Sequence, residues 1–179
     1  TRLTAMLRAR DATHRRYAAP RRTETCEFLR REGLLPAIYF IFSRAGCNAA
    51  AASMADHGLR LTSAEEAAAI RAAAVEHTAH LDPADLAVLG YGRWLAGLEA
   101  GVAPHHAGLV PAFKEAVERL FAAGLVKLVF ATETLSLGIN MPARSVVLES
   151  LPKFGGAGHE LLQAGDYTQL TGRAGRRGT

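Results

Sequence analysis

Short apolar runs and longer helical spacings alternate along this chain. Residues 37–42 form a continuous apolar run rich in β-forming side chains, which is typical of a strand buried on both faces. Three more segments predict short strands, the first of them running into a turn: residues 101–108, 126–130 and 145–148. Apolar positions three or four apart predict helices at residues 23–33, 45–57 and 111–124. This alternation predicts an α/β fold with a mostly parallel sheet. The glycine-rich residues 155–158 predict a loop after the last strand.

The stretch around residues 63–100 adds helices to this basic pattern. A capping box that begins at Ser63 opens one helix. Asp82, followed by a proline, opens another that we expect to continue through Trp94 and Leu98. We interpret the stretch as a helical insertion. The helical spacing of Trp94 favours a core position, and a platform on which a base stacks is the alternative.

Length and charge limit the class of protein. A chain of 179 residues predicts one domain of ordinary size. The net charge of +4 permits a nucleic-acid partner without establishing one. Arginines crowd residues 1–22, which we interpret as a linker or arm from a preceding domain, with residues 23–179 forming the domain itself. A solvated linker explains the crowding more simply than a specific RNA-binding arm.

Cysteine usage and hydropathy predict the compartment. Cys26 and Cys47 do not form a metal-binding C-x-x-C pair and suggest reduced thiols. No apolar run reaches membrane-spanning length, and the first residues lack the apolar segment of a signal peptide. We therefore predict a cytoplasmic protein with no membrane partner, and the many alanines and arginines suggest a bacterial source. Because the chain opens with Thr1 and stops soon after an arginine motif, we expect a piece of a larger protein.

Residues 169–178 combine arginines with small residues. Arg173 and Arg176 can direct two permanently charged guanidinium groups at one anionic target. Such groups stabilise the charge that develops on the γ-phosphate during phosphoryl transfer. Gly172 and Gly175 let the backbone approach a ligand closely. The segment therefore predicts a phosphate site, with a basic, flexible tail as the alternative.

Polar residues follow three of the predicted strands, at the ends where ligands gather in open parallel sheets. In chain order they are Ser43 and Arg44, then His105 and His106 with Gly108, then Thr132 and Glu133. Hydroxyl and backbone N–H groups at such ends are ready ligands for phosphate. The histidine pair could instead bind a metal, but no third ligand lies at a suitable spacing. His105 could equally be a buried, hydrogen-bonded histidine.

Four segments resemble the motifs of superfamily-2 helicases of the DExH class. Residues 130–144 resemble motif V, residues 169–178 resemble motif VI, and residues 105–111 resemble motif IVa. Residues 42–44 stand where motif IV belongs. The similarity extends over about residues 23–179, and it is closest to the superkiller and exosome-helicase branch with its actinobacterial HelY-type relatives.

This resemblance implies the second RecA-like domain of an ATP-dependent RNA helicase, with the three-layer αβα sandwich of P-loop NTPases. ATP would lie between two RecA-like domains, and Mg²⁺ would be held mainly by the first domain, which this chain does not contain. Arg173 and Arg176 would be arginine fingers, and Gln169 would lie near the γ-phosphate and the attacking water. Three further residues would lie at the nucleotide, namely Gly138, Asn140 and Gly172.

The resemblance also implies contacts with single-stranded nucleic acid. The residues concerned are Ser43, Arg44, His106, Gly108, Thr132 and Glu133. Thr132 would bind one phosphate and Ser43 with Arg44 another, without reading bases. Glu133 could be a general base, but the catalytic acidic pair of this family lies on the other RecA-like domain, so a structural or coupling role is implied.

We therefore expect a domain of a helicase that moves 3′–5′ along single-stranded RNA and unwinds duplexes. The chain has neither a G-x-x-x-x-G-K-[ST] loop nor an Asp-Glu-x-His box, so the isolated fragment is expected to lack ATPase activity. Its expected partners are RNA and the first RecA-like domain of the same polypeptide, with an RNA-degrading nuclease complex as a further candidate. No metal site is expected on this chain. A DNA-repair helicase or translocase and a non-hydrolysing scaffold remain the alternatives.

Overall fold

The computed structural model describes residues 20–133, 141–150, 152–154 and 159–172. At its centre lies a sheet of four parallel strands in the order β2-β3-β1-β4. The strands are β1 (Ala37–Phe40), β2 (Val102–His105), β3 (Leu128–Ala131) and β4 (Ser145–Leu148). Phe40 pairs in register with Ala131 and Leu148, and Ala131 with His105, so all four strands end at one edge. We call it the carboxyl edge, and the opposite one the amino edge.

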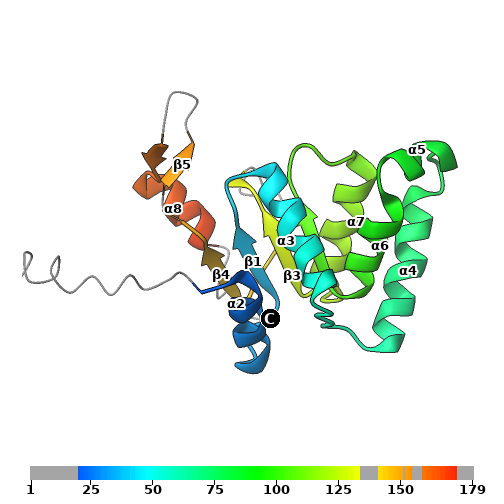
Figure 1. Ribbon diagram of the computed structural model, residues 1–179, viewed down its shortest axis with the longest axis horizontal. Helices are drawn as coiled ribbons and strands as arrows, with labels where there is room; N and C mark the ends of the chain where they lie inside the picture. The colour runs from blue at the N-terminus through cyan, green and yellow to red at the C-terminus, as the bar shows by residue number, and fades with distance from the viewer. Residues whose placement is uncertain (1–19, 134–140, 151, 155–158, 173–179) are drawn as a thin grey trace, which may run out of the picture.

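Helices cover both faces of this sheet, as Figure 1 shows. One layer consists of α2 (Arg22–Arg31) and α3 (Arg44–Asp56). The other consists of α4 (Ala64–Thr78), α5 (Pro83–Val88), α6 (Tyr91–Glu99) and α7 (Pro111–Ala122). Because side chains alternate along a strand, Tyr39 packs with the first layer whereas Ile38 and Phe40 pack with the second. The predicted three-layer α/β sandwich is confirmed.

The predicted helix from Asp82 through Leu98 is in fact two helices. Gly90 separates α5 from α6 with a φ of 70°, a left-handed conformation that glycine adopts without steric cost. Trp94 of α6 is 8% exposed, and its ring stacks on that of Phe113 with centroids 4.1 Å apart. The prediction of one continuous helix is therefore wrong, while the core position of Trp94 is confirmed.

The C-terminal part contains a hairpin that the sequence pattern did not predict. β5 (Pro152–Phe154) and β6 (His159–Leu161) are antiparallel and flank residues 155–158, which lie outside the described residues. Strands of three residues are too short to show the alternation that identifies a strand. Helix α8 (Ala164–Thr171) follows, and its buried Leu170 joins the core that contains Phe40.

The N-terminal boundary differs slightly from the prediction. Residues 1–19 of the predicted arm lie outside the described residues, and α2 already begins at Arg22. Within the part of the chain that the structure describes, no helix is long and apolar enough to cross a bilayer.

Candidate nucleic-acid and nucleotide site

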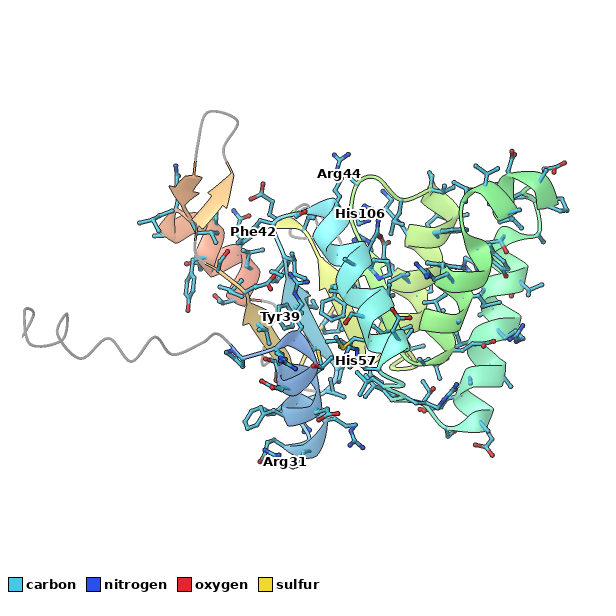
Figure 2. The ribbon with its side chains drawn as sticks, in the orientation of Figure 1. Arg31, Tyr39, Phe42, Arg44, His57 and His106 are labelled. Atoms are coloured by element: carbon cyan, nitrogen blue, oxygen red, sulfur yellow. The ribbon has the colours of Figure 1, made fainter. Side chains whose placement is uncertain are left out.

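Three polar segments, far apart in sequence, meet at the carboxyl edge of the sheet. Residues 43–44 follow β1, residues 106–108 follow β2, and residues 132–133 follow β3. Because β3 lies between β2 and β1, the third segment occupies the middle position. Figure 2 shows Arg44 and His106 near each other at the end of the sheet where α3 begins. We call these segments the three edge segments, and they contain all six residues assigned above to nucleic acid.

Ser43 begins helix α3 and caps it. Its Oγ accepts a hydrogen bond from the N–H of Gly46 at 3.1 Å. Because Oγ is the acceptor here, the hydroxyl proton can still donate to a second group. A Cβ at Gly46 would lie 2.8 Å from Cγ2 of Ile41, so glycine lets the helix start this close to the strand. Ser43 thus presents an exposed hydroxyl at the positive end of a 13-residue helix.

Arg44 supplies positive charge at the same place. Its side chain is exposed, and no carboxylate among the described residues forms an ion pair with it. A Cβ at Gly108 would lie 3.4 Å from Cδ of Arg44, so the arginine stem packs against the segment that follows β2. The guanidinium group is therefore held at the edge with its charge unneutralised, which suits a phosphate.

His106 connects two elements beneath this surface. The residue is 3% exposed, and its Nδ1 accepts a hydrogen bond from the N–H of Gly108 at 3.2 Å. Its Nε2 lies 2.9 Å from Oδ1 of Asn48 on α3 and donates to it, because an amide oxygen can only accept. Burial lowers the pKa of His106, and the charge of Arg44 lowers it further, which favours the neutral form of the ring. Both ring nitrogens are thus bonded within the protein, and Ala107 and Gly108 are the exposed residues of this segment.

His105 points to the opposite face and has a different partner. Its Nε2 lies 2.8 Å from Oε1 of Glu118 on α7, and the residue is 3% exposed. Burial lowers the pKa of His105 more than the nearby carboxylate of Glu118 raises it. Among the described residues no group of histidine, cysteine, aspartate and glutamate side chains could hold a metal ion. His105 is therefore the buried, hydrogen-bonded histidine that was one of the two sequence interpretations.

Thr132 and Glu133 complete the carboxyl edge. The backbone N–H of Thr132 donates to the carbonyl oxygen of His105 at 3.3 Å, which ties the middle edge segment to the end of β2. Thr132 is 8% exposed, whereas Glu133 is exposed. The two neighbouring side chains thus differ in solvent exposure: Thr132 is mostly covered, and Glu133 lies on the surface.

The residues assigned to the nucleotide are only partly described. Gln169 and Gly172 lie at the end of α8 and are exposed, while Leu170 between them is buried and fixes the helix. At this end of α8 the side-chain amide of Gln169 can donate to a phosphate, whereas the backbone N–H of Gly172 already donates to the carbonyl oxygen of Thr168 at 2.8 Å. The other four assigned residues lie outside the described residues; they are Gly138, Asn140, Arg173 and Arg176.

Two partners of the histidine pair were not singled out from the sequence. Asn48 lies four positions after Arg44 in the same helix, a spacing that places both on one helix face. That spacing is the signal that could have identified it. Glu118 reaches His105 from a helix 13 residues further along the chain, and no local pattern indicates the contact.

A parallel sheet between two helical layers, with polar residues at its carboxyl edge, is consistent with a RecA-like domain. Residues 75–178 match the family described as helicase conserved C-terminal domain. The match covers more than half of the 179 residues, and this chain belongs to that family, as the C-terminal helicase domain of a superfamily-2 helicase.

Curated relatives agree with this assignment. The chain is 60% identical over 162 residues to the probable helicase HelY of Mycobacterium tuberculosis, covering 90% of this chain and 18% of that protein. It is 40% identical over 168 residues to the DExH-box ATP-dependent RNA helicase DExH11 of Arabidopsis thaliana, covering 94% and 12%. It is 41% identical over 150 residues to superkiller complex protein 2 of Homo sapiens, covering 84% and 12%. The chain thus spans less than a fifth of the length of each relative.

Proposed function

We propose that this chain is the second motor domain of an ATP-dependent helicase that moves 3′–5′ on single-stranded RNA and unwinds duplexes. The observation that most supports the proposal is the meeting of the three edge segments at one edge of the sheet. They offer a serine hydroxyl, a guanidinium group and exposed backbone, which bind a sugar-phosphate strand without reading its sequence. The relative DExH11 is itself named an ATP-dependent RNA helicase.

In this proposal ATP is a substrate that the first RecA-like domain of the same polypeptide holds, together with Mg²⁺. Arg173 and Arg176 contribute positive charge to the γ-phosphate when the two domains close, and Gln169 orients the attacking water. Gly138, Asn140 and Gly172 line the nucleotide. Opening and closing of the two domains would then move the edge segments relative to the strand contacts of the first domain, and repeated cycles would produce directional movement.

The geometry of the carboxyl edge supports the contacts that we propose with the strand. Ser43 donates its hydroxyl proton to one phosphate, and the guanidinium of Arg44 contributes charge beside it. Thr132 binds a neighbouring phosphate, and Glu133 couples this segment to the nucleotide cleft. A cytoplasmic location and association with an RNA-degrading nuclease complex belong to the same proposal. The name of superkiller complex protein 2 supports a complex for that relative.

Replacing Arg176 by alanine in the full-length protein tests the central chemical step. We expect RNA-stimulated ATP hydrolysis to fall by a factor of about 10³ or more, the usual contribution of an arginine finger, with RNA affinity nearly unchanged. Arg177→Ala is the matched control, because it removes a neighbouring arginine with no assigned role. Loss of RNA binding together with normal ATPase activity in Arg176→Ala would contradict the proposal.

Two comparisons separate this function from its alternatives. Unwinding of RNA and DNA duplexes that carry the same 3′ overhang distinguishes an RNA helicase from a DNA-repair helicase. A full-length protein that binds RNA but hydrolyses no ATP would instead be a scaffold. The isolated chain is expected to hydrolyse no ATP, because it lacks the phosphate-binding loop, and robust turnover by it would also contradict the proposal.

A further inference from the structure

The side chain of Asn48 links two of the three edge segments, which lie on strands that are not neighbours. Its Oδ1 accepts a hydrogen bond from Nε2 of His106 at 2.9 Å. Asn48 belongs to α3, which begins at Arg44 within the segment that follows β1, whereas His106 belongs to the segment that follows β2. In the sheet β3 separates these two strands, and α3 packs over both β3 and β2, which brings Asn48 to His106.

The second ring nitrogen of His106 fixes the backbone of the segment that follows β2. Nδ1 accepts the N–H of Gly108 at 3.2 Å, so the ring lies between the amide of Asn48 and the backbone of Gly108. Arg44 completes the arrangement, because its Cδ lies 3.4 Å from the position that a Cβ of Gly108 would take. One buried ring therefore holds in place the backbone against which the arginine stem packs.

A neutral ring is required for both hydrogen bonds at once. Nε2 must carry the proton that Asn48 accepts, and Nδ1 must keep the lone pair that Gly108 needs. A doubly protonated ring would present a donor to the Gly108 N–H and lose that contact. Burial and the charge of Arg44 lower the pKa of His106 and so favour the neutral form.

We infer that Asn48 is a positioning residue for strand binding, which acts through His106 to hold Arg44 and the Gly108 backbone in one arrangement. This inference rests on the proposed function, in which Arg44 meets a phosphate. An arginine side chain loses considerable rotamer freedom when it binds, so holding its stem beforehand reduces that cost. Asn48 itself does not need to contact the strand for this effect.

The test measures affinity for single-stranded RNA in the full-length protein over a series of salt concentrations. Asn48→Leu keeps the branched shape of the side chain and removes the acceptor for His106. We expect affinity to fall about five- to tenfold, and the slope of log affinity against log salt to shrink by about 0.7, the value for one phosphate contact on a single strand. Ala49→Leu, a change at the neighbouring exposed position of α3, is the matched control and should alter neither quantity.

A double-mutant cycle separates positioning through Arg44 from a direct contact. Arg44→Ala should reproduce the loss of affinity and of slope, and adding Asn48→Leu to it should cost little more, because the positioned group is already gone. His106→Phe, which keeps a ring without hydrogen bonds, should match Asn48→Leu, and the pair should not be additive. The thermal unfolding midpoint is recorded for each variant, since a purely structural role lowers the midpoint and leaves the salt slope unchanged.

The outcomes distinguish failure of the positioning role of Asn48 from failure of the proposed function. If Arg44→Ala weakens RNA binding but Asn48→Leu does not, or if their effects add in full, Asn48 does not position Arg44 and the inference is overturned. If Arg44→Ala leaves both affinity and slope unchanged, the proposed strand contact at this edge is itself wrong, and the inference falls with it.

Discussion

The two edges of the parallel sheet use polar side chains in opposite ways. At the amino edge these groups are bonded inside the domain: Lys127 pairs with Glu66 at 2.8 Å, and Arg144 donates to a backbone carbonyl. At the carboxyl edge Glu149 pairs with Arg22 at 2.8 Å, but Ser43 and Arg44 are exposed, and Arg44 forms no ion pair among the described residues. We expect one edge to stabilise the fold and the other, under the proposed function, to bind the strand, because ligands gather at the carboxyl ends of strands in open α/β sheets. Substitutions at the two edges should therefore change different quantities.

The largest effect on the free energy of unfolding is expected at the amino edge, from Gly101→Ala. Gly101 has a φ of 83°, and a Cβ there would lie 3.0 Å from Cγ2 of Thr62 and 3.1 Å from Cβ of Leu61. The left-handed backbone costs about 1–2 kcal/mol for alanine, and the crowding adds about 1–3 kcal/mol. We expect a total loss of about 2–5 kcal/mol, measured by urea denaturation of this chain.

A second glycine supplies the control for that experiment. Gly124 has a φ of 70° and no atom within 4 Å of a Cβ, so Gly124→Ala carries only the backbone cost. The difference between the two variants isolates the contacts with Thr62 and Leu61. Equal losses would show that Gly101 is not crowded, and weaker RNA binding by folded Gly101→Ala would contradict the division between the edges.

Ser43 tests the carboxyl edge, where stability and binding should separate. Ser43→Ala removes the cap of α3 and should cost about 1 kcal/mol of unfolding free energy, together with part of the RNA affinity. Ser43→Asp restores a cap acceptor, so it should recover the stability. Its negative charge repels phosphate, so RNA affinity should fall below that of Ser43→Ala. Urea denaturation measures the stability of each variant, and RNA titration measures its affinity. If Ser43→Asp binds RNA as tightly as the native protein does, Ser43 does not contact the strand.

The sequence predicted the outline of the fold because the signals concerned are local. The apolar run at residues 37–42 and the capping box at Ser63 became β1 and α4. The strand order β2-β3-β1-β4 has no local signal, since it depends on which apolar faces pack together across the whole chain. The break at Gly90 was missed because a single glycine is compatible with a continuous helix, and only its left-handed φ ends one.

The same distinction applies to the candidate site. Ser43 and Thr132 were singled out because each follows an apolar run, and ligands gather where parallel strands end. The roles of the two adjacent histidines could not be separated in this way. His105 bonds Glu118 and His106 bonds Asn48, on opposite sides of the sheet, and these partners are brought together by tertiary packing alone.

The smallest effect is expected from Lys127→Met, which removes the ion pair at the amino edge and keeps most of the side-chain stem. Exposed pairs contribute about 0.2–1 kcal/mol, and Glu66 is only partly covered. The hydrogen bond from Lys127 lowers the pKa of Glu66 below 4.5, so the pair stabilises the fold above pH 4.5 and loses its effect as the pH falls below that value. The unfolding free energies of the native chain and the variant should therefore differ at neutral pH and converge in acid. At neutral pH the two proteins should bind RNA with equal affinity. A difference that persists in acid would show that the hydrogen bond from Nζ of Lys127 to the carbonyl oxygen of Gly124, rather than the ion pair, stabilises this edge.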